Sequence, residues 1–184
     1  MTTLHEIFSL LCGQQHSWVV GGAELPFCQR CTGLYMGAVP ALLVFLWFRP
    51  KATKGMLWTH GMCLLLMVPF GYHLVAQTGR IRMLTGQLFA IGLVYYLTLL
   101  IADRWPNQRE LSPRGITGYF AAGLAALFLL QASVIWGGPR TNVVLSWIGF
   151  GGLLIYGLLV LVNLMLLAVA APEFLRRRAH YSDT

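Results

Sequence analysis

The stretch CQRCTGLYMGAVPALLVFLWF, residues 28–48, joins two closely spaced cysteines directly to a long apolar run. A helix needs about 20 apolar residues to cross the hydrocarbon core of a bilayer, and residues 31–48 approach that length without a single charge. Because no water reaches the backbone in lipid, a segment of this kind has to be helical. The stretch therefore predicts a membrane helix with a Cys-x-x-Cys pair at its mouth.

The whole chain has the composition of a membrane protein. Of its 184 residues, 57% are hydrophobic and 10% are charged, whereas average soluble proteins carry roughly 25% charged residues. The net charge of +7 comes from short basic clusters between apolar runs, which is typical of topology signals and not of a nucleic-acid-binding face. We therefore predict an all-α, polytopic helical bundle in the plasma or inner membrane of the cell, surrounded by lipid and without a nucleic-acid partner.

Five apolar segments alternate with short polar connections. They predict transmembrane helices over residues 31–48, 57–76, 83–102, 116–136 and 143–171. Pro40 and Pro69 are expected to kink the first two. Before the first span, the apolar spacing in residues 1–20 favours a short surface helix. The chain is accordingly divided into an extracytoplasmic Cys/His segment (1–30), the bundle (31–171) and a basic cytoplasmic tail (172–184).

Lys and Arg are shared unequally between the two sides of such a bundle. Four lie on the side of the N-terminus: Arg30, Arg80, Arg82 and Arg140. Nine lie on the other side: Arg49, Lys51, Lys54, Arg104, Arg109, Arg114, Arg176, Arg177 and Arg178. Because cytoplasmic loops carry the excess of Lys and Arg, we predict that the N-terminus and the cysteines face outward and that the C-terminus is cytoplasmic.

Small residues at intervals of four predict where helices approach each other closely in the membrane. One such stripe is Gly33, Gly37 and Ala41 in the first span. The other, in the fourth span, is Gly118, Ala122 and Ala126. Such stripes serve packing within the bundle, or association with partners in a larger membrane complex, of which the chain would be an accessory subunit.

Four residues with metal-ligand chemistry fall close together at the start of the chain. They are Cys12, His16, Cys28 and Cys31, with the spacing Cys-x3-His-x11-Cys-x2-Cys. A tetrahedral Cys3His site takes four such ligands, with one closely spaced pair forming a knuckle. Zinc is the natural ion for this set, ahead of copper(I) or iron. The pattern predicts a structural zinc cap that clamps the N-terminal segment onto the first helix.

The same cysteines allow two other interpretations. The pair Cys28 and Cys31 could act as a thiol-disulfide oxidoreductase that passes electrons to a membrane quinone, because the helix dipole and Arg30 favour a thiolate at the helix start. The third interpretation is a plain structural disulfide with one cysteine left over. Covalent c-type haem is disfavoured because Thr32, and not histidine, follows the second cysteine.

Further polar residues are predicted near the outer ends of the second and third spans. Charged and polar groups inside a membrane are costly and often functional. Four of them could therefore line a site beneath the cysteines and support its ligands: His73, Arg82, Thr85 and Gln87. Their alternative role is solvation at the membrane interface, which is favoured for Arg80. His60 and Cys63, nearer the other side, are interpreted as packing residues.

Two stretches resemble a known family. Residues 25–37, LPFCQRCTGLYMG, and residues 82–88, RMLTGQL, are similar to the signatures of the membrane proteins grouped as domain of unknown function 2085. Pro69 and Gln77 also stand where the family has a proline and a glutamine. The chain departs from the family in carrying Gly13 after the first cysteine and His73 at a usually acidic position. The resemblance covers about residues 12–90 and implies a membrane-bound, cysteine-rich module without naming a reaction.

Overall fold

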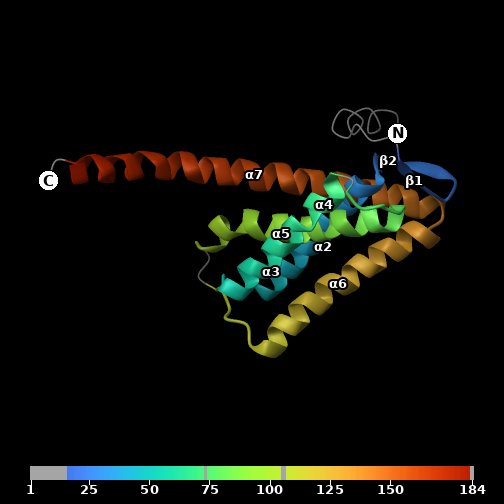
Figure 1. The fold of residues 1–184 in the computed structure, drawn as a ribbon, viewed down its shortest axis with the longest axis horizontal. Coiled ribbons are helices and arrows are strands. Elements are labelled where there is room, and N and C mark those ends of the chain that lie inside the picture. Colours follow the sequence, from blue (N-terminus) through green and yellow to red (C-terminus); the bar gives the residue numbers. More distant parts are fainter. Residues whose placement is uncertain (1–15, 73, 105–106, 183–184) are drawn as a thin grey trace.

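A computed structural model of the chain describes residues 16–72, 74–104 and 107–182, with side chains described as far as residue 170. Its elements, in chain order, are β1 (Ser17–Val20), β2 (Ala23–Cys28), α2 (Gln29–Phe48), α3 (Lys54–Leu65), α4 (Met67–Gly71), α5 (Gly79–Ala102), α6 (Pro113–Trp136) and α7 (Pro139–Ser182). The long helices lie beside one another and the two strands sit at one end of them (Figure 1). The predicted helical membrane bundle is thus confirmed.

Among the described residues, four helices are long and apolar enough to cross a membrane. They are α2, α5, α6 and the part of α7 from Pro139 to Ala170. The predicted span over residues 57–76 is different, because the chain forms the shorter helices α3 and α4 there. Pro69 accounts for the break: a proline cannot donate to the carbonyl four residues earlier and clashes with it, and α3 ends at that residue, Leu65. Pro40, in contrast, is accommodated inside α2.

The short helices α3 and α4 together still run the length of α2. Met56, near the start of α3, packs in a cluster with Phe45 from the last turn of α2. At the other end, the carbonyl oxygen of Phe70 in α4 accepts a hydrogen bond of 2.7 Å from Arg30, in the first turn of α2. The chain therefore returns from one end of the bundle to the other before α5 begins (Figure 1).

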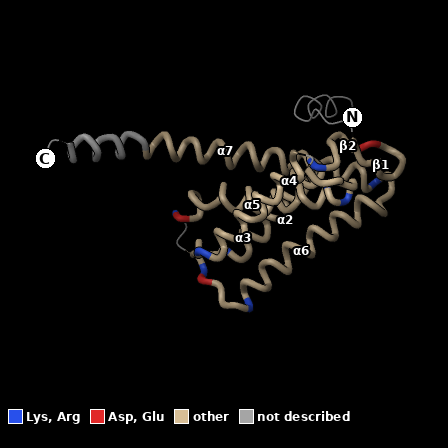
Figure 2. Tube along the Cα trace, in the orientation of Figure 1, with Lys and Arg blue, Asp and Glu red and all other residues tan. Residues whose placement is uncertain are grey.

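The connections α2–α3 and α5–α6 meet at the end opposite the strands. Arg109 N–H donates to the carbonyl of Arg49, and Lys51 N–H donates to the carbonyl of Arg109, both at 2.9 Å. Lys and Arg lie at the two ends of the bundle, and the tube between them is almost free of charge (Figure 2). The two ends thus divide the basic residues described up to residue 170 into the groups expected from the sequence.

A β-hairpin occupies residues 17–28, where the sequence predicted no strand and, up to residue 20, favoured a helix. Gly21 and Gly22 make its turn with φ of +59° and +83°, values that glycine adopts without the steric cost of a side chain. Asn142 in α7 secures the hairpin, since its amide donates to the carbonyls of Val20 (3.3 Å) and Ala23 (2.8 Å). The hairpin therefore rests on the first turn of α7.

The helix α2 lies at the centre of the bundle, and its closest neighbour is α5. A Cβ on Gly33 would collide with the backbone oxygen of Met83, and one on Gly86 would collide with that of Arg30. The stripe that includes Gly33 and Gly37 therefore lets the two backbones touch, as predicted. Gly118 of the second stripe only meets the ring of Phe48 at ordinary contact distance, 3.6 Å.

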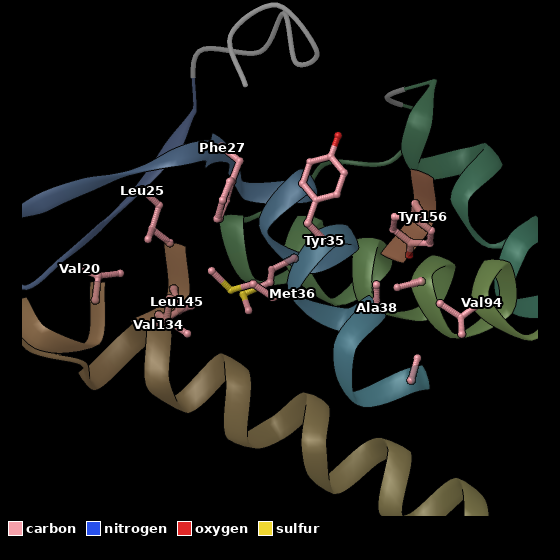
Figure 3. Packing of buried hydrophobic residues seen from close by; sticks show 13 residues of the cluster. Val20, Leu25, Phe27, Tyr35, Met36, Ala38, Val94, Val134, Leu145 and Tyr156 are labelled. Atoms are coloured by element: carbon pink, nitrogen blue, oxygen red, sulfur yellow. The ribbon is translucent and has the colours of Figure 1, made fainter. Parts of the chain in front are cut away.

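Buried apolar side chains from six elements (β1, β2, α2, α5, α6 and α7) form the core around this helix pair. Figure 3 shows Leu25 and Phe27 of the hairpin pointing toward Met36 of α2, with Val134 of α6 and Leu145 of α7 alongside. The hairpin thus closes one end of the bundle by packing as well as by hydrogen bonds. This packing fixes the position of the cysteine pair, which lies where β2 passes into α2.

Candidate site at the cysteine end of the bundle

The cysteine pair lies on the first turn of α2. Cys28 is the last residue of β2 and the N-cap of the helix, and its Sγ accepts a hydrogen bond from the N–H of Cys31 at 3.4 Å. The side chain of Cys28 is buried and that of Cys31 is half-buried. The two cysteines are therefore neighbours on one helical turn, and this hydrogen bond links the side chain of the first to the backbone of the second.

His16 is brought to the same place by the hairpin. Its carbonyl oxygen accepts a hydrogen bond of 2.8 Å from the N–H of Gln29, and the next residue, Ser17, pairs with Cys28. The imidazole itself is exposed. Cys12, the fourth predicted ligand, lies outside the described residues. Within the residues described, no three His, Cys, Asp or Glu side chains gather as metal ligands.

Arg30, between the two cysteines, is the centre of a buried polar network that was not predicted as part of the site. Its Nη2 donates to the Phe70 carbonyl at 2.7 Å and to Gln77 Oε1 at 2.8 Å. The amide of Gln77 also donates to the same carbonyl. Only 8% of the Arg30 side chain is exposed. The sequence did contain a feature that indicated this network: an arginine at the start of a membrane helix, where charged residues are often functional.

The polar residues predicted beneath the cysteines have different neighbours. The buried Thr85 hydroxyl donates to the carbonyl of Arg82 in its own helix. Gln87 is fully buried and links α5 to α6: its amide donates to the Leu127 carbonyl, and its Oε1 accepts from Gln131, both at 3.3 Å. The Gln87 contacts are structural hydrogen bonds between helices, whereas the Thr85 bond lies within α5. His73 lies outside the described residues.

The two motif segments, residues 28–33 and 82–87, face each other across the α2–α5 contact. Gly33 abuts the backbone at Met83 and Gln87, and Gly86 abuts the backbone at Arg30. The absence of side chains at these two glycines brings the first turns of α2 and α5 together. The cysteine pair, Arg30 and Arg82 therefore belong to one region of the molecule.

A second polar cluster and a cavity lie further along the bundle. His60 is fully buried, with Nδ1 2.7 Å from the Met56 carbonyl and Nε2 3.0 Å from the Tyr119 hydroxyl. An apolar cavity of about 190 Å³ adjoins it, lined by residues that include Ala41, Cys63 and Tyr119. Ala41 follows Cys31 by ten residues of α2, or about 15 Å along the helix. The cavity is thus remote from the cysteine pair.

The comparisons with known proteins address the first half of the chain. The family model described as "Predicted membrane protein (DUF2085)" matches residues 12–96. The match spans the cysteine pair and continues into α5, so it confirms the resemblance predicted from the sequence. No curated protein and no solved structure matches the chain. Together with the four long apolar helices, the match identifies a multi-pass membrane protein.

Proposed function

We propose that this protein, which resembles the predicted membrane proteins of the DUF2085 family over residues 12–96, carries a structural zinc ion at the outer end of its bundle. The proposed ligands are Cys12, His16, Cys28 and Cys31. The observation that supports this proposal most is the cysteine pair on the first turn of α2, with Cys28 Sγ accepting the N–H of Cys31. Closely spaced cysteines in this arrangement form the knuckle of structural zinc sites.

Two further observations fit a zinc cap. The backbone of His16 is held beside the start of α2 by its hydrogen bond with Gln29, which keeps this proposed ligand near the cysteine pair. Three thiolates and one imidazole around Zn2+ would carry a net negative charge. The buried guanidinium of Arg30, which lies between Cys28 and Cys31 in the sequence, has the opposite charge. Zinc would tie the N-terminal segment to α2, and its binding free energy would add to the stability of the fold.

The metal content of the purified protein tests this proposal. We expect about one zinc ion per chain and its loss in Cys28→Ser, because removing one thiolate opens the tetrahedral site. Cys63→Ser is the matched control, since Cys63 lines the distant cavity, and it should retain the zinc. Elemental analysis of both variants, with thiol counting before and after chelation, provides the measurement. Metal-free wild-type protein would refute the zinc cap.

The second candidate function is a thiol-disulfide oxidoreductase, favoured by the same hydrogen bond to Cys28 Sγ at a helix start. This candidate predicts metal-free protein with a Cys28–Cys31 bridge that a reductant opens, giving two more titratable thiols per chain. A quinone that accepted its electrons would have to bind at the cysteine end, because the apolar cavity is about 15 Å away along α2. The thiol count therefore separates the two candidates.

We also propose five membrane crossings with the cysteine end outside, α3 and α4 together making one broken crossing. The pairing of Arg49 and Lys51 with Arg109 supports this arrangement, because it puts two strongly basic connections on the side that the Lys/Arg bias makes cytoplasmic. In intact cells, a membrane-impermeant maleimide should label Arg140→Cys above the parent protein, whereas Lys51→Cys should be labelled no more than the parent protein. Both replaced side chains are exposed. The reverse labelling pattern would invert the orientation.

A further inference from the structure

We propose that the cysteine end of the bundle binds a phosphate-type oxyanion at the N-terminus of α5, held by the guanidinium groups of Arg30 and Arg82. This site is separate from the proposed zinc cap, since neither arginine is among the zinc ligands. The ligand is a phosphate group, either free or in the head group of an anionic lipid. Four observations carry the inference.

The first observation is the position of Arg30. Its guanidinium is hydrogen-bonded to Gln77, and Gln77 directly precedes Thr78, the N-cap of α5. The arginine thus extends from α2 to the start of a different helix. The positive end of the helix dipole and free backbone N–H groups make such a helix start a natural site for an anion.

The second observation is that Arg30 is buried without a countercharge among the hydrogen-bond partners that the described residues provide. A guanidinium keeps its charge in proteins, and a buried charge is costly unless it is paired. Within the described part of the chain, the hydrogen-bond partners of Arg30 are the carbonyl of Phe70 and the amide of Gln77, both neutral. Its Nε is buried and has no partner within the described part of the chain. A bound anion would satisfy this donor and neutralise the charge.

The third observation is that a second arginine, Arg82, also has a buried Nε without a hydrogen-bond partner among the described residues. Arg82 lies at the start of α5, one turn before Gly86, which touches the backbone of Arg30. Residues four apart lie on the same side of a helix, so Arg82 belongs to the side of α5 that meets α2.

The fourth observation concerns the charges at the start of α5, where the side chain of Gln29 lies against Gly79. Its first turn contains no acidic residue, and its first residue is Gly79. The Thr78 side chain satisfies the N–H of Ile81. A planar guanidinium binds the oxygens of phosphate in pairs, which gives geometric selectivity as well as charge. The combined features therefore favour a tetrahedral oxyanion over chloride.

Because the site lies at the end of a predicted span, its phosphate group could come from the solvent or from a lipid head group. The start of α5 lies at the outer end of a predicted span, where lipid head groups are found. Binding of inorganic phosphate, measured by calorimetry on the full-length protein in an uncharged detergent, tests the free ion. Native mass spectrometry with added phosphatidylglycerol tests the lipid head group. Binding of either probe supports the site, and a preference for one identifies the source.

Arg82→Gln is the informative variant, because Arg82 is less buried than Arg30 and its loss should leave the fold intact. We expect the probe that binds to bind about tenfold more weakly, as one charge-assisted contact is lost. Arg140→Gln is the matched control: it removes the same charge from an exposed position at the same end, and affinity should change less than about threefold. The proposal is overturned if neither probe binds the wild type, or if both variants weaken binding equally.

Discussion

Replacing Gly86 with alanine is expected to separate α2 from α5 and to leave little correctly folded protein. The new Cβ would collide with the backbone oxygen of Arg30, and a backbone atom cannot move aside as the end of a side chain can. Alanine improves helix propensity by about 1 kcal/mol, so propensity alone predicts stabilisation. The collision decides the sign of the change in stability, because overpacking a closely packed contact costs about 3 kcal/mol, which exceeds the gain in helix propensity.

Thermal unfolding in detergent, with the monodisperse fraction measured by size-exclusion chromatography, checks this result. Gly157→Ala is the control, since Gly157 lies in a membrane helix of the same protein and a Cβ there meets no atom within 4 Å. That variant should be as stable as the wild type or slightly more stable. Equal stability of the Gly86 and Gly157 variants would show that α2 and α5 do not touch through their backbones.

Such a contact is the kind of feature that the sequence can reveal. The four-residue spacing of Gly33 and Gly37 predicted a close helix approach, and the structure supplies it. The partner stripe was less visible, because in α5 it combines Gly86 with Ala90 and backbone atoms. Small-residue spacing indicates that a helix face can be approached, but the identity of the approaching helix depends on the whole fold. For the same reason, the second predicted stripe has no close backbone contact at Gly118, where a Cβ would meet only the ring of Phe48.

The broken helix and the hairpin show where local patterns lose their predictive force. An apolar run over residues 57–76 fits a continuous span by length and composition, yet Pro69 ends α3 at Leu65. Residues 17–28 form strands because Gly21 and Gly22 turn the chain and Asn142, more than a hundred positions later, binds the turn. That tertiary contact leaves no trace in the local spacing.

The sequence showed which residues of the candidate site lie together, but not which residues they contact. The Cys-x-x-Cys pair at the head of a membrane helix was evident, and the hairpin does bring the backbone of His16 beside it. Arg30 was noted only for its effect on a thiol, because its acceptors, Phe70 and Gln77, lie 40 and 47 residues away. Gln87 was assigned to the cysteine site, but it bonds to α6. Polar residues in a membrane find whichever partner the packing offers.

His60→Ala is expected to be the most destabilising substitution away from the cysteine end. The Met56 carbonyl can only accept, so Nδ1 of His60 carries the proton and Nε2 accepts from the Tyr119 hydroxyl. The ring also stacks on Tyr95, with centroids 3.8 Å apart. Alanine would leave a cavity and an unpaired buried hydroxyl, for a combined loss of about 3 kcal/mol. Thr59→Ala, which removes an exposed hydroxyl bonded within its own helix, should change stability little.

The loss can be divided between packing and hydrogen bonding by adding Tyr119→Phe. That substitution alone should cost about 1 kcal/mol, since it removes the hydroxyl but keeps the ring. In the His60→Ala background the same change should cost nothing or even stabilise, because the hydroxyl has already lost its acceptor. Unfolding free energies of the four proteins give the coupling directly. Additive effects would mean that α3 is held to α6 by ring packing alone.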